Sequence, residues 1–267
     1  MASHDDNDLN GPRGELARLL ARLETRAGLT GGALRLLLEH AEISYPGVHL
    51  PLLTSRQPST QLRFLLRGVV KLVEDQGPFG RTIVDLVGAG EFLCLPPLAL
   101  ADSVRQIVAA VHEGPVVVAL MPRGVLVEAT GRMPRDNMAR LMSWSWRAPW
   151  QLAYGKAALL GLPTERRLMS ELVRLAPRFG RPYDERWTLL QVRLQQNDLS
   201  ALIGRARSNV SRAFVKLRKQ SLVDRVGDRL LIATSLVRAP GPACSPVVPS
   251  RPSTEDAEAA PRPAANH

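Results

Sequence analysis

The residues best suited to chemistry in this chain stand together at the start of one predicted helix, 207–220: Arg207, Ser208, Asn209 and Arg212. An arginine side chain can donate two hydrogen bonds to the edge of a guanine, and an asparagine amide can both donate and accept on an adenine. The apolar residues of this helix recur at helical spacing and are Val210, Ala213, Phe214 and Leu217. The pattern predicts that the apolar face packs on a core while the basic face enters the major groove of DNA.

A second predicted helix, 196–203, precedes this one and completes a helix-turn-helix. Leu199, Leu202 and Ile203 lie on one side of it. Gly204 stands between the two helices, where glycine adopts the left-handed conformation at little steric cost. Two short strands follow and are predicted to form a wing. The alternative is a solvated helical hairpin with scattered arginines, which the turn glycine, the apolar spacing and the basic face together disfavour.

The positive charge of the chain is concentrated around these helices. The net charge is +10, and residues 163–238 hold 16 Lys and Arg against 7 Asp and Glu, a net of +9. Residues 1–162 have a net of +2, and residues 239–267 have a net of −1. Because a positive field attracts phosphates, this distribution predicts a nucleic-acid partner whose binding depends on salt concentration.

Four further side chains on or beside the predicted helix 207–220 are candidates for phosphate contact. Ser211 stands among the base-reading candidates and is expected to touch a phosphate. Arg205, Lys216 and Lys219 form a weaker electrostatic set, for which a solvated face is the alternative.

Composition bounds the class of protein. The 267 residues suffice for two compact domains with loose ends. Two cysteines, Cys94 and Cys244, can build neither a disulfide framework nor the four-thiolate ligation of an iron–sulfur cluster. No stretch of the sequence has the about 18 consecutive apolar residues that a membrane span needs. The polar N-terminus lacks the apolar core of a signal peptide. We expect a cytoplasmic protein, of prokaryotic type.

The N-terminal half is predicted to contain helices followed by short strands. Residues 1–12 are expected to be disordered, and residues 13–40 carry leucines at helical spacing with a break at Gly31-Gly32. Residues 43–127 change to short β-like runs divided by Gly, Pro and Asp, which predicts a small antiparallel barrel or roll. The three clearest strand-like runs are 62–73, 82–87 and 107–120.

The C-terminal half begins with helical patterns. Residues 134–160 form a long segment rich in Leu, Met and Trp. A hinge then precedes a helix at 164–176, and residues 177–187 are predicted to be a loop. The tail, 239–267, is rich in proline and poor in apolar bulk, which predicts disorder.

This order of parts resembles the Crp/Fnr family of bacterial transcription regulators. The resemblance covers residues 43–233 and is most specific in the helix-turn-helix. The segments that carry it are LLRGVVKL (65–72), TIVDLVGAGEFL (82–93), MPRGVLVEA (121–129), PTERRLMSELVRLA (163–176) and NDLSALIGRARSNVSRAFVKLRKQSLV (197–223). It implies an α+β fold with an N-terminal antiparallel β-roll of the cupin-like jelly-roll type, a long dimerisation helix and a C-terminal winged helix-turn-helix.

The resemblance also implies a domain plan. Its parts are a disordered N-terminus at 1–12, N-terminal helices and a cyclic-nucleotide-binding-like sensory roll at 13–130, a dimerisation helix at 131–160, a DNA-binding domain at 161–238 and a disordered tail at 239–267. A homodimer would present two recognition helices to a two-fold symmetric site on double-stranded DNA. RNA polymerase is a further implied partner.

The recognition helix keeps part of the family pattern. Arg207 and Arg212 match arginine positions of the motif. Ser208 departs from it, because many members carry a glutamate there that accepts a hydrogen bond from cytosine. The usual half-site of the family is therefore not carried over to this chain.

Within the roll, the resemblance implies an effector pocket in the segment 90–106. Its candidate residues are Gly90, Glu91, Phe92, Cys94, Arg105 and Gln106. Arg105 stands where the family neutralises a cyclic phosphate, although it could instead pair with Asp102 or Glu91.

The same segment departs from cyclic-nucleotide binders. Cys94-Leu95 stands where they have Gly-Glu, and a leucine leaves a ribose hydroxyl without its acceptor, at a cost on the order of 1–3 kcal/mol. Pro96-Pro97 removes two backbone donors. We therefore expect an effector other than a conventionally bound cyclic nucleotide, and a regulator that responds to cyclic AMP or cyclic GMP is the alternative. No cofactor is assigned, and the identity of the effector stays open.

Other function classes find less support. The sequence has no nucleotide loop, no clustered metal-ligand spacing and no nucleophile with a recognisable partner, so we expect neither an enzyme nor a metal site. A ligand-binding or protein-interaction module without specific DNA binding is a further alternative. Cys94 could be a redox sensor and His112 a haem ligand, but a buried small hydrophobe and a structural histidine are the favoured interpretations.

Overall fold

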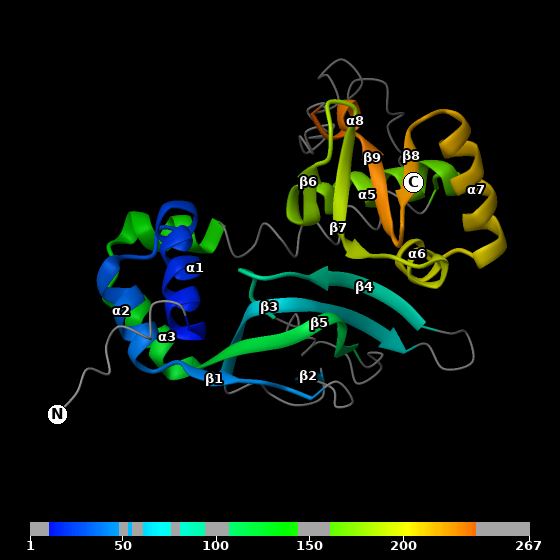
Figure 1. The fold of residues 1–267 in the computed structure, drawn as a ribbon. Coiled ribbons are helices and arrows are strands. Elements are labelled where there is room, and N and C mark those ends of the chain that lie inside the picture. Colours follow the sequence, from blue (N-terminus) through cyan, green and yellow to red (C-terminus); the bar gives the residue numbers. More distant parts are fainter. Residues whose placement is uncertain are drawn as a thin grey trace, which may run out of the picture.

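The computed structural model describes residues 11–47, 53–54, 61–75, 81–93, 107–143 and 161–238 (Figure 1). Helices and antiparallel strands alternate in two regions along the chain, a roll sheet with N-terminal helices and a C-terminal domain with its own sheet. This arrangement confirms the α+β class. The predicted disordered ends fall outside the described residues, apart from Gly11 and Pro12.

Two helices open the described chain, and the break between them is not where we predicted it. Helix α1 (Pro12–Ala27) ends at Gly28, whose φ of 76° is left-handed. Helix α2 (Gly31–Glu39) begins directly afterwards, with Thr30 as N-cap accepting a hydrogen bond from the backbone N–H of Ala33. The Gly-Gly pair therefore starts the second helix instead of separating the two, because the threonine cap supplies the start signal.

The roll sheet contains five strands among the described residues. These are β1 (Glu42–Ser44), β2 (Leu53–Thr54), β3 (Gln61–Asp75), β4 (Arg81–Val87) and β5 (Ile107–Pro122). The antiparallel order is β1-β5-β3-β4, with β2 also paired to β5. The three strands predicted from the sequence are confirmed, with bounds a few residues longer.

The N-terminal helices cover one end of the roll. Helix α3 (Arg123–Gly131) follows β5, and residues 135–143 are also helical. Leu16, Leu20 and Leu37 are buried in one cluster with Phe64 and Met121 of the roll strands. The rest of the expected dimerisation helix, from 144 onward, lies outside the described residues.

The C-terminal domain is a helix-turn-helix framed by a small sheet. Its elements are α5 (Thr164–Phe179), β6 (Gly180–Pro182), β7 (Trp187–Arg193), α6 (Gln196–Ile203), α7 (Arg207–Lys219), β8 (Val223–Val226), β9 (Arg229–Ala233) and α8 (Thr234–Arg238). The sheet order is β6-β7-β9-β8, so the two predicted wing strands belong to a four-stranded sheet.

The loop predicted at 177–187 is wrong in its first half. Helix α5 continues through Pro177 to Phe179, and β6 follows at once. Proline has no N–H to donate, which normally ends a helix. Here Arg178 and Phe179 contact the roll, and those tertiary contacts favour the extra helical turn.

The helix-turn-helix has the predicted apolar core. Leu199, Leu202 and Ile203 of α6 are buried with Val210 and Phe214 of α7. Gly204 ends α6 in the left-handed conformation, with φ of 62°. The two helices and their turn are therefore confirmed to within a residue.

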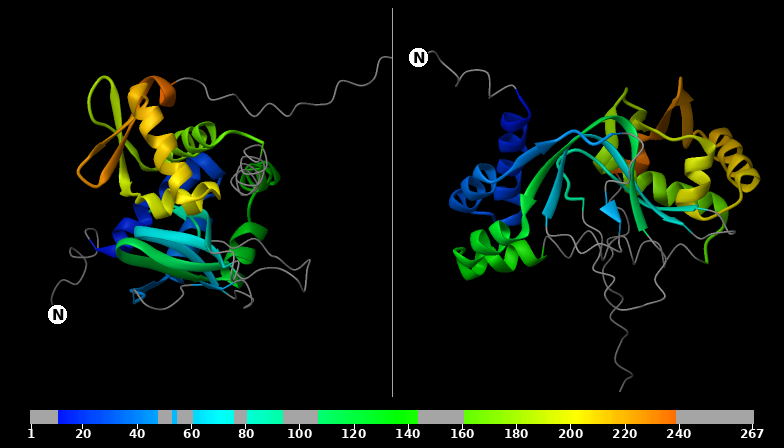
Figure 2. Two further views of the ribbon diagram at one scale, coloured as in Figure 1. Left: turned by 90° about the vertical axis from the view of Figure 1, so that its right-hand side faces the viewer. Right: turned by 90° about the horizontal axis from the view of Figure 1, so that it is seen from below.

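The C-terminal domain packs directly on the roll. Helix α6 lies along β4, and Figures 1 and 2 show the domain stacked over that strand and away from α1 and α2. Ile83 and Leu86 of β4 belong to the same buried cluster as the helix-turn-helix residues. One continuous apolar core therefore spans the two regions.

Candidate nucleic-acid interface

The N-terminal turn of α7 presents the predicted base-reading residues outward. Arg207, Ser208 and Arg212 are exposed, and Asn209 is half-buried. No side chain caps the helix N-terminus at Ala206. The backbone N–H groups of the first turn therefore add a partial positive charge to the basic face.

Arg212 and Asn209 form a pair one turn apart. The Arg212 guanidinium donates to Oδ1 of Asn209 over 2.6 Å. This bond restrains both side chains before any partner arrives, which lowers the entropy lost on binding. The two residues that sequence reasoning assigned to guanine and adenine are thus held side by side.

Two of the expected phosphate contacts have partners inside the domain. Nζ of Lys216 lies 3.1 Å from a carboxylate oxygen of Glu165 on α5. A hydrogen bond from its own backbone N–H and one from Lys216 lower the pKa of Glu165. Ser211 lies 3.5 Å from the side-chain oxygen of Gln196 on α6, which leaves its hydroxyl at the edge of the same face.

Arg205 lies in the turn, beside a buried arginine of α5. Arg167 donates through one terminal nitrogen to the carbonyl of Ile203 over 3.2 Å and so satisfies the end of α6. Burial lowers the pKa of Arg167, and the nearby charge of Arg205 lowers it further. These contacts place Arg205 at the junction of the helices and hold the turn in shape.

The wing adds a basic residue that sequence reasoning missed. Arg225 on β8 donates to the carbonyl of Leu194 over 2.9 Å, and its guanidinium lies 5.5 Å from the centre of the Phe214 ring. It lines a surface hollow together with Gln195, Gln196, Asn197 and Arg207. A basic residue in a predicted wing strand was the available signal.

Val215 is the second residue that sequence reasoning missed. Its side chain is 54% exposed on α7, one turn beyond Ser211 and Arg212. An exposed valine on a basic helix face has no role in the core. In a major groove the matching apolar group is the methyl of thymine.

The described part of the expected effector pocket has internal partners. Gly90 adopts a φ of 86° and donates its N–H to the carbonyl of Leu65 over 2.8 Å. The ring of Phe92 meets Phe64 edge-on, with centroids 4.8 Å apart. Cys94, Arg105 and Gln106 lie outside the described residues, as does Asp102.

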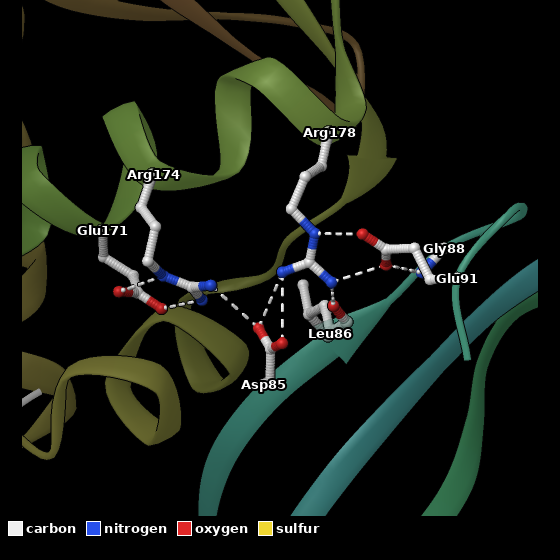
Figure 3. A network of polar contacts seen from close by, with 7 residues as sticks. All are labelled: Asp85, Leu86, Gly88, Glu91, Glu171, Arg174 and Arg178. Atoms are coloured by element: carbon white, nitrogen blue, oxygen red, sulfur yellow. Dashed lines mark hydrogen bonds and ion pairs between the residues drawn. The ribbon is translucent and has the colours of Figure 1, made fainter. Parts of the chain in front are cut away.

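Glu91 faces the C-terminal domain (Figure 3). Its two carboxylate oxygens accept from the Arg178 guanidinium over 2.7 and 2.6 Å, and one of them also accepts from the N–H of Gly88. Asp102 and Glu91 were the two alternative partners expected for Arg105. Of these, Glu91 is bonded to Arg178 of α5.

His112 also lies where the two regions meet. Its Nε2 is 2.7 Å from the carbonyl of Arg193. The neighbouring Glu113 accepts from the backbone N–H of Arg193 over 2.7 Å. This geometry gives His112 a structural contact, as the favoured interpretation expected.

The described part of the chain offers neither a metal site nor a membrane span. Among those residues, no group of three His, Cys, Asp or Glu side chains is arranged to hold a metal ion. Within the same residues, no helix has the length and apolar character needed to cross a bilayer.

Comparison with known proteins agrees with this geometry. Residues 166–235 match the model of the Crp-like helix-turn-helix domain. No curated protein sequence matches the chain. Among solved structures, a cyclic nucleotide-binding domain containing protein from Listeria monocytogenes EGD-e is 13% identical, with a TM-score of 0.60, covering 83% of this chain and 99% of that one.

Two further solved structures share the fold. FixK2 from Bradyrhizobium japonicum is 19% identical, with a TM-score of 0.57 over 73% of this chain and 95% of that one. A mutant of CooA from Carboxydothermus hydrogenoformans is 16% identical, with the same TM-score over 74% and 85%. The chain therefore carries a Crp-like helix-turn-helix domain on the fold of the Crp/Fnr regulators, which confirms the resemblance seen in its sequence.

Proposed function

We propose that this chain, with its Crp-like helix-turn-helix domain, is a DNA-binding transcription regulator that reads duplex DNA through α7. The observation that carries the proposal is the exposed face at the start of α7, where Arg207, Ser208 and Arg212 project from a buried framework. The major groove admits a helix of this kind, and the base edges there offer acceptors to arginine.

A homodimer on a two-fold symmetric site is the finer form of this proposal. One recognition helix touches few base pairs, whereas two in successive major grooves double the readout. The segment 134–158, rich in Leu, Met and Trp, is the proposed interface. Val127 on the adjoining helix α3 is 62% exposed, which leaves an apolar side chain accessible to a partner there.

The roll is proposed to sense an effector that is not a conventionally bound cyclic nucleotide. Leu95 supplies no acceptor for a ribose hydroxyl, and Pro96-Pro97 supplies no donors for a phosphate. Titration with cyclic AMP and cyclic GMP tests this point. A gain of about tenfold or more in operator affinity would restore the cyclic-nucleotide alternative.

A regulator of this kind would act in the cytoplasm and meet RNA polymerase there.

Selection of bound duplexes from a random pool tests the function. We expect an inverted repeat whose half-sites are centred about 10 base pairs apart, or a multiple of that, because two linked recognition helices must face the same side of the duplex. Recovery of duplexes without any shared motif would contradict sequence reading and favour the module without specific DNA binding.

A further inference from the structure

The last turn of α5 is bonded to the roll through one arginine, Arg178. All three guanidinium nitrogens of Arg178 donate to acceptors on or next to β4: both oxygens of Glu91, both oxygens of Asp85 at 3.0 and 3.1 Å, and the carbonyl of Leu86. The pairing with Glu91 is bidentate, which fixes direction as well as distance. Figure 3 shows the side chain reaching from α5 to the roll.

A second arginine, one turn earlier, extends the contact. Arg174 lies 2.9 Å from Asp85 and also forks onto Glu171, over 2.6 and 3.1 Å. The side chains of Arg174 and Arg178 are each 24% exposed, and that of Asp85 is 16% exposed. Burial alone would lower the pKa of each arginine, but Glu91 and Asp85 raise that of Arg178, and Glu171 and Asp85 raise that of Arg174, so both arginines stay charged.

The backbone of the roll comes close to α5 at the same place. A Cβ on Gly88 would lie 2.8 Å from the ring of Phe179. Glycine therefore permits an approach that any larger residue would obstruct. Gly88 stands three residues from each of the ion-pair partners Asp85 and Glu91 on the roll.

The two regions are also joined at a second point, on β5. Glu113 accepts from the backbone N–H of Arg193 and pairs with Arg229 over 3.2 Å. Polar contacts on β4 and on β5, together with the apolar core that Ile83 and Leu86 share with the C-terminal domain, leave that domain little freedom to rotate on the roll.

We propose that Arg178, through Glu91 and Asp85, is a positioning residue that sets the orientation of the C-terminal domain on the roll and thereby the half-site spacing that the dimer accepts. This inference rests on the proposed function. Apolar contacts alone are non-directional and tolerate sliding. A partly buried, bidentate ion pair adds little net stability but is satisfied in one geometry only.

The half-site spacing is the property that the contact of Arg178 with Glu91 and Asp85 would control. Each base pair inserted between two half-sites turns one of them by about 35° and moves it by about 3.4 Å. A dimer with fixed domains cannot follow that change. A dimer whose domains swivel on the hinge can follow it.

The experiment compares full-length wild type with Arg178→Ala on the selected operator and on versions with one base pair inserted or removed at its centre. Wild type should bind the altered operators at least about thirtyfold more weakly than the original. In Arg178→Ala the ratio of the affinity for the original operator to that for an altered operator should fall below about threefold. Affinity for a duplex with a single half-site should be the same for both proteins, because Arg178 lies outside the α7 face.

Three controls separate positioning from folding. Arg166→Ala removes an exposed arginine from the same helix and should keep the wild-type ratio. Arg178→Lys keeps the charge but loses the fork, so its ratio should lie between wild type and alanine. Gly88→Ala disturbs the same contact between α5 and the roll without changing any charge and should also lower the ratio.

The outcomes are distinct. If wild type shows no preference for any symmetric site, the proposed function fails. If wild type discriminates between spacings and Arg178→Ala, with intact half-site binding, discriminates equally well, the positioning role is wrong. If Arg178→Ala loses half-site binding as well, Gly88→Ala decides, and an unchanged ratio in that variant overturns the proposal.

Discussion

Arg207 and Arg212 enter the proposed interface in different states. Arg212 is held by Asn209 at 2.6 Å, while Arg207 lines the hollow that it shares with Arg225. A restrained arginine loses less entropy on binding and is better suited to a fixed bidentate contact. Arg207 is better placed to adjust between a base and a nearby phosphate.

Replacing either arginine should therefore weaken sequence reading. We expect Arg207→Ala and Arg212→Ala each to cost about 1–3 kcal/mol at the selected site and to relax base preference at one position. Binding titrations on single-base variants of the operator measure both effects. Equal weakening on every duplex would mean that these arginines contact phosphate only.

Val215 allows an independent test of how α7 lies in the groove. If its side chain meets a thymine methyl, replacing that thymine by deoxyuridine should weaken wild-type binding about fourfold, the value of one buried methyl group. The Val215→Ala variant should be insensitive to the same replacement. Equal sensitivity of both proteins at every thymine would place Val215 outside the interface.

At the scale of elements, Arg167 links two helices of the C-terminal domain. It is 6% exposed, and it donates to the carbonyl of Ile203 at the end of α6. Arg167→Ala leaves that acceptor unsatisfied and should lower the free energy of unfolding by about 1–3 kcal/mol. Thermal unfolding measures the loss, and Arg166→Ala, one residue away and exposed, is the matched control. Equal stability of the two variants would contradict this role.

The elements also show what the sequence could reveal. The two helices of the helix-turn-helix were predictable because their apolar spacing and Gly204 are local signals. The end of α5 was not, because Arg178 and Phe179 favour the extra turn through contacts with the roll. Neither Glu91 nor Gly88, which supply those contacts, lies near α5 in the sequence.

The candidate site follows the same rule. The exposed face of α7 could be predicted from residue types within 13 positions. The pairing of Lys216 with Glu165 could not, because the two stand 51 residues apart. Interactions between distant segments depend on the packing of whole elements, and apolar periodicity carries no information about them.

At the scale of the whole molecule, the proposed dimer can be tested without disturbing the described core. Leu141 packs on the N-terminal helical cluster, so a charge there would also disrupt the subunit. Trp146, in the same apolar segment, is the better choice. We expect Trp146→Glu to sediment as a monomer while wild type sediments as a dimer. A dimeric variant would move the interface away from 134–158.

The central claim is that α7 reads the sequence of duplex DNA. The most direct measurement is the ratio of wild-type affinities for the selected operator and for a scrambled duplex of equal length, taken at one physiological salt concentration. We expect the operator to bind at least about a thousandfold more tightly, and Arg212→Ala to reduce that ratio. A ratio near one, with binding that merely weakens as salt rises, would contradict the account, because the basic charge would then hold DNA without reading it.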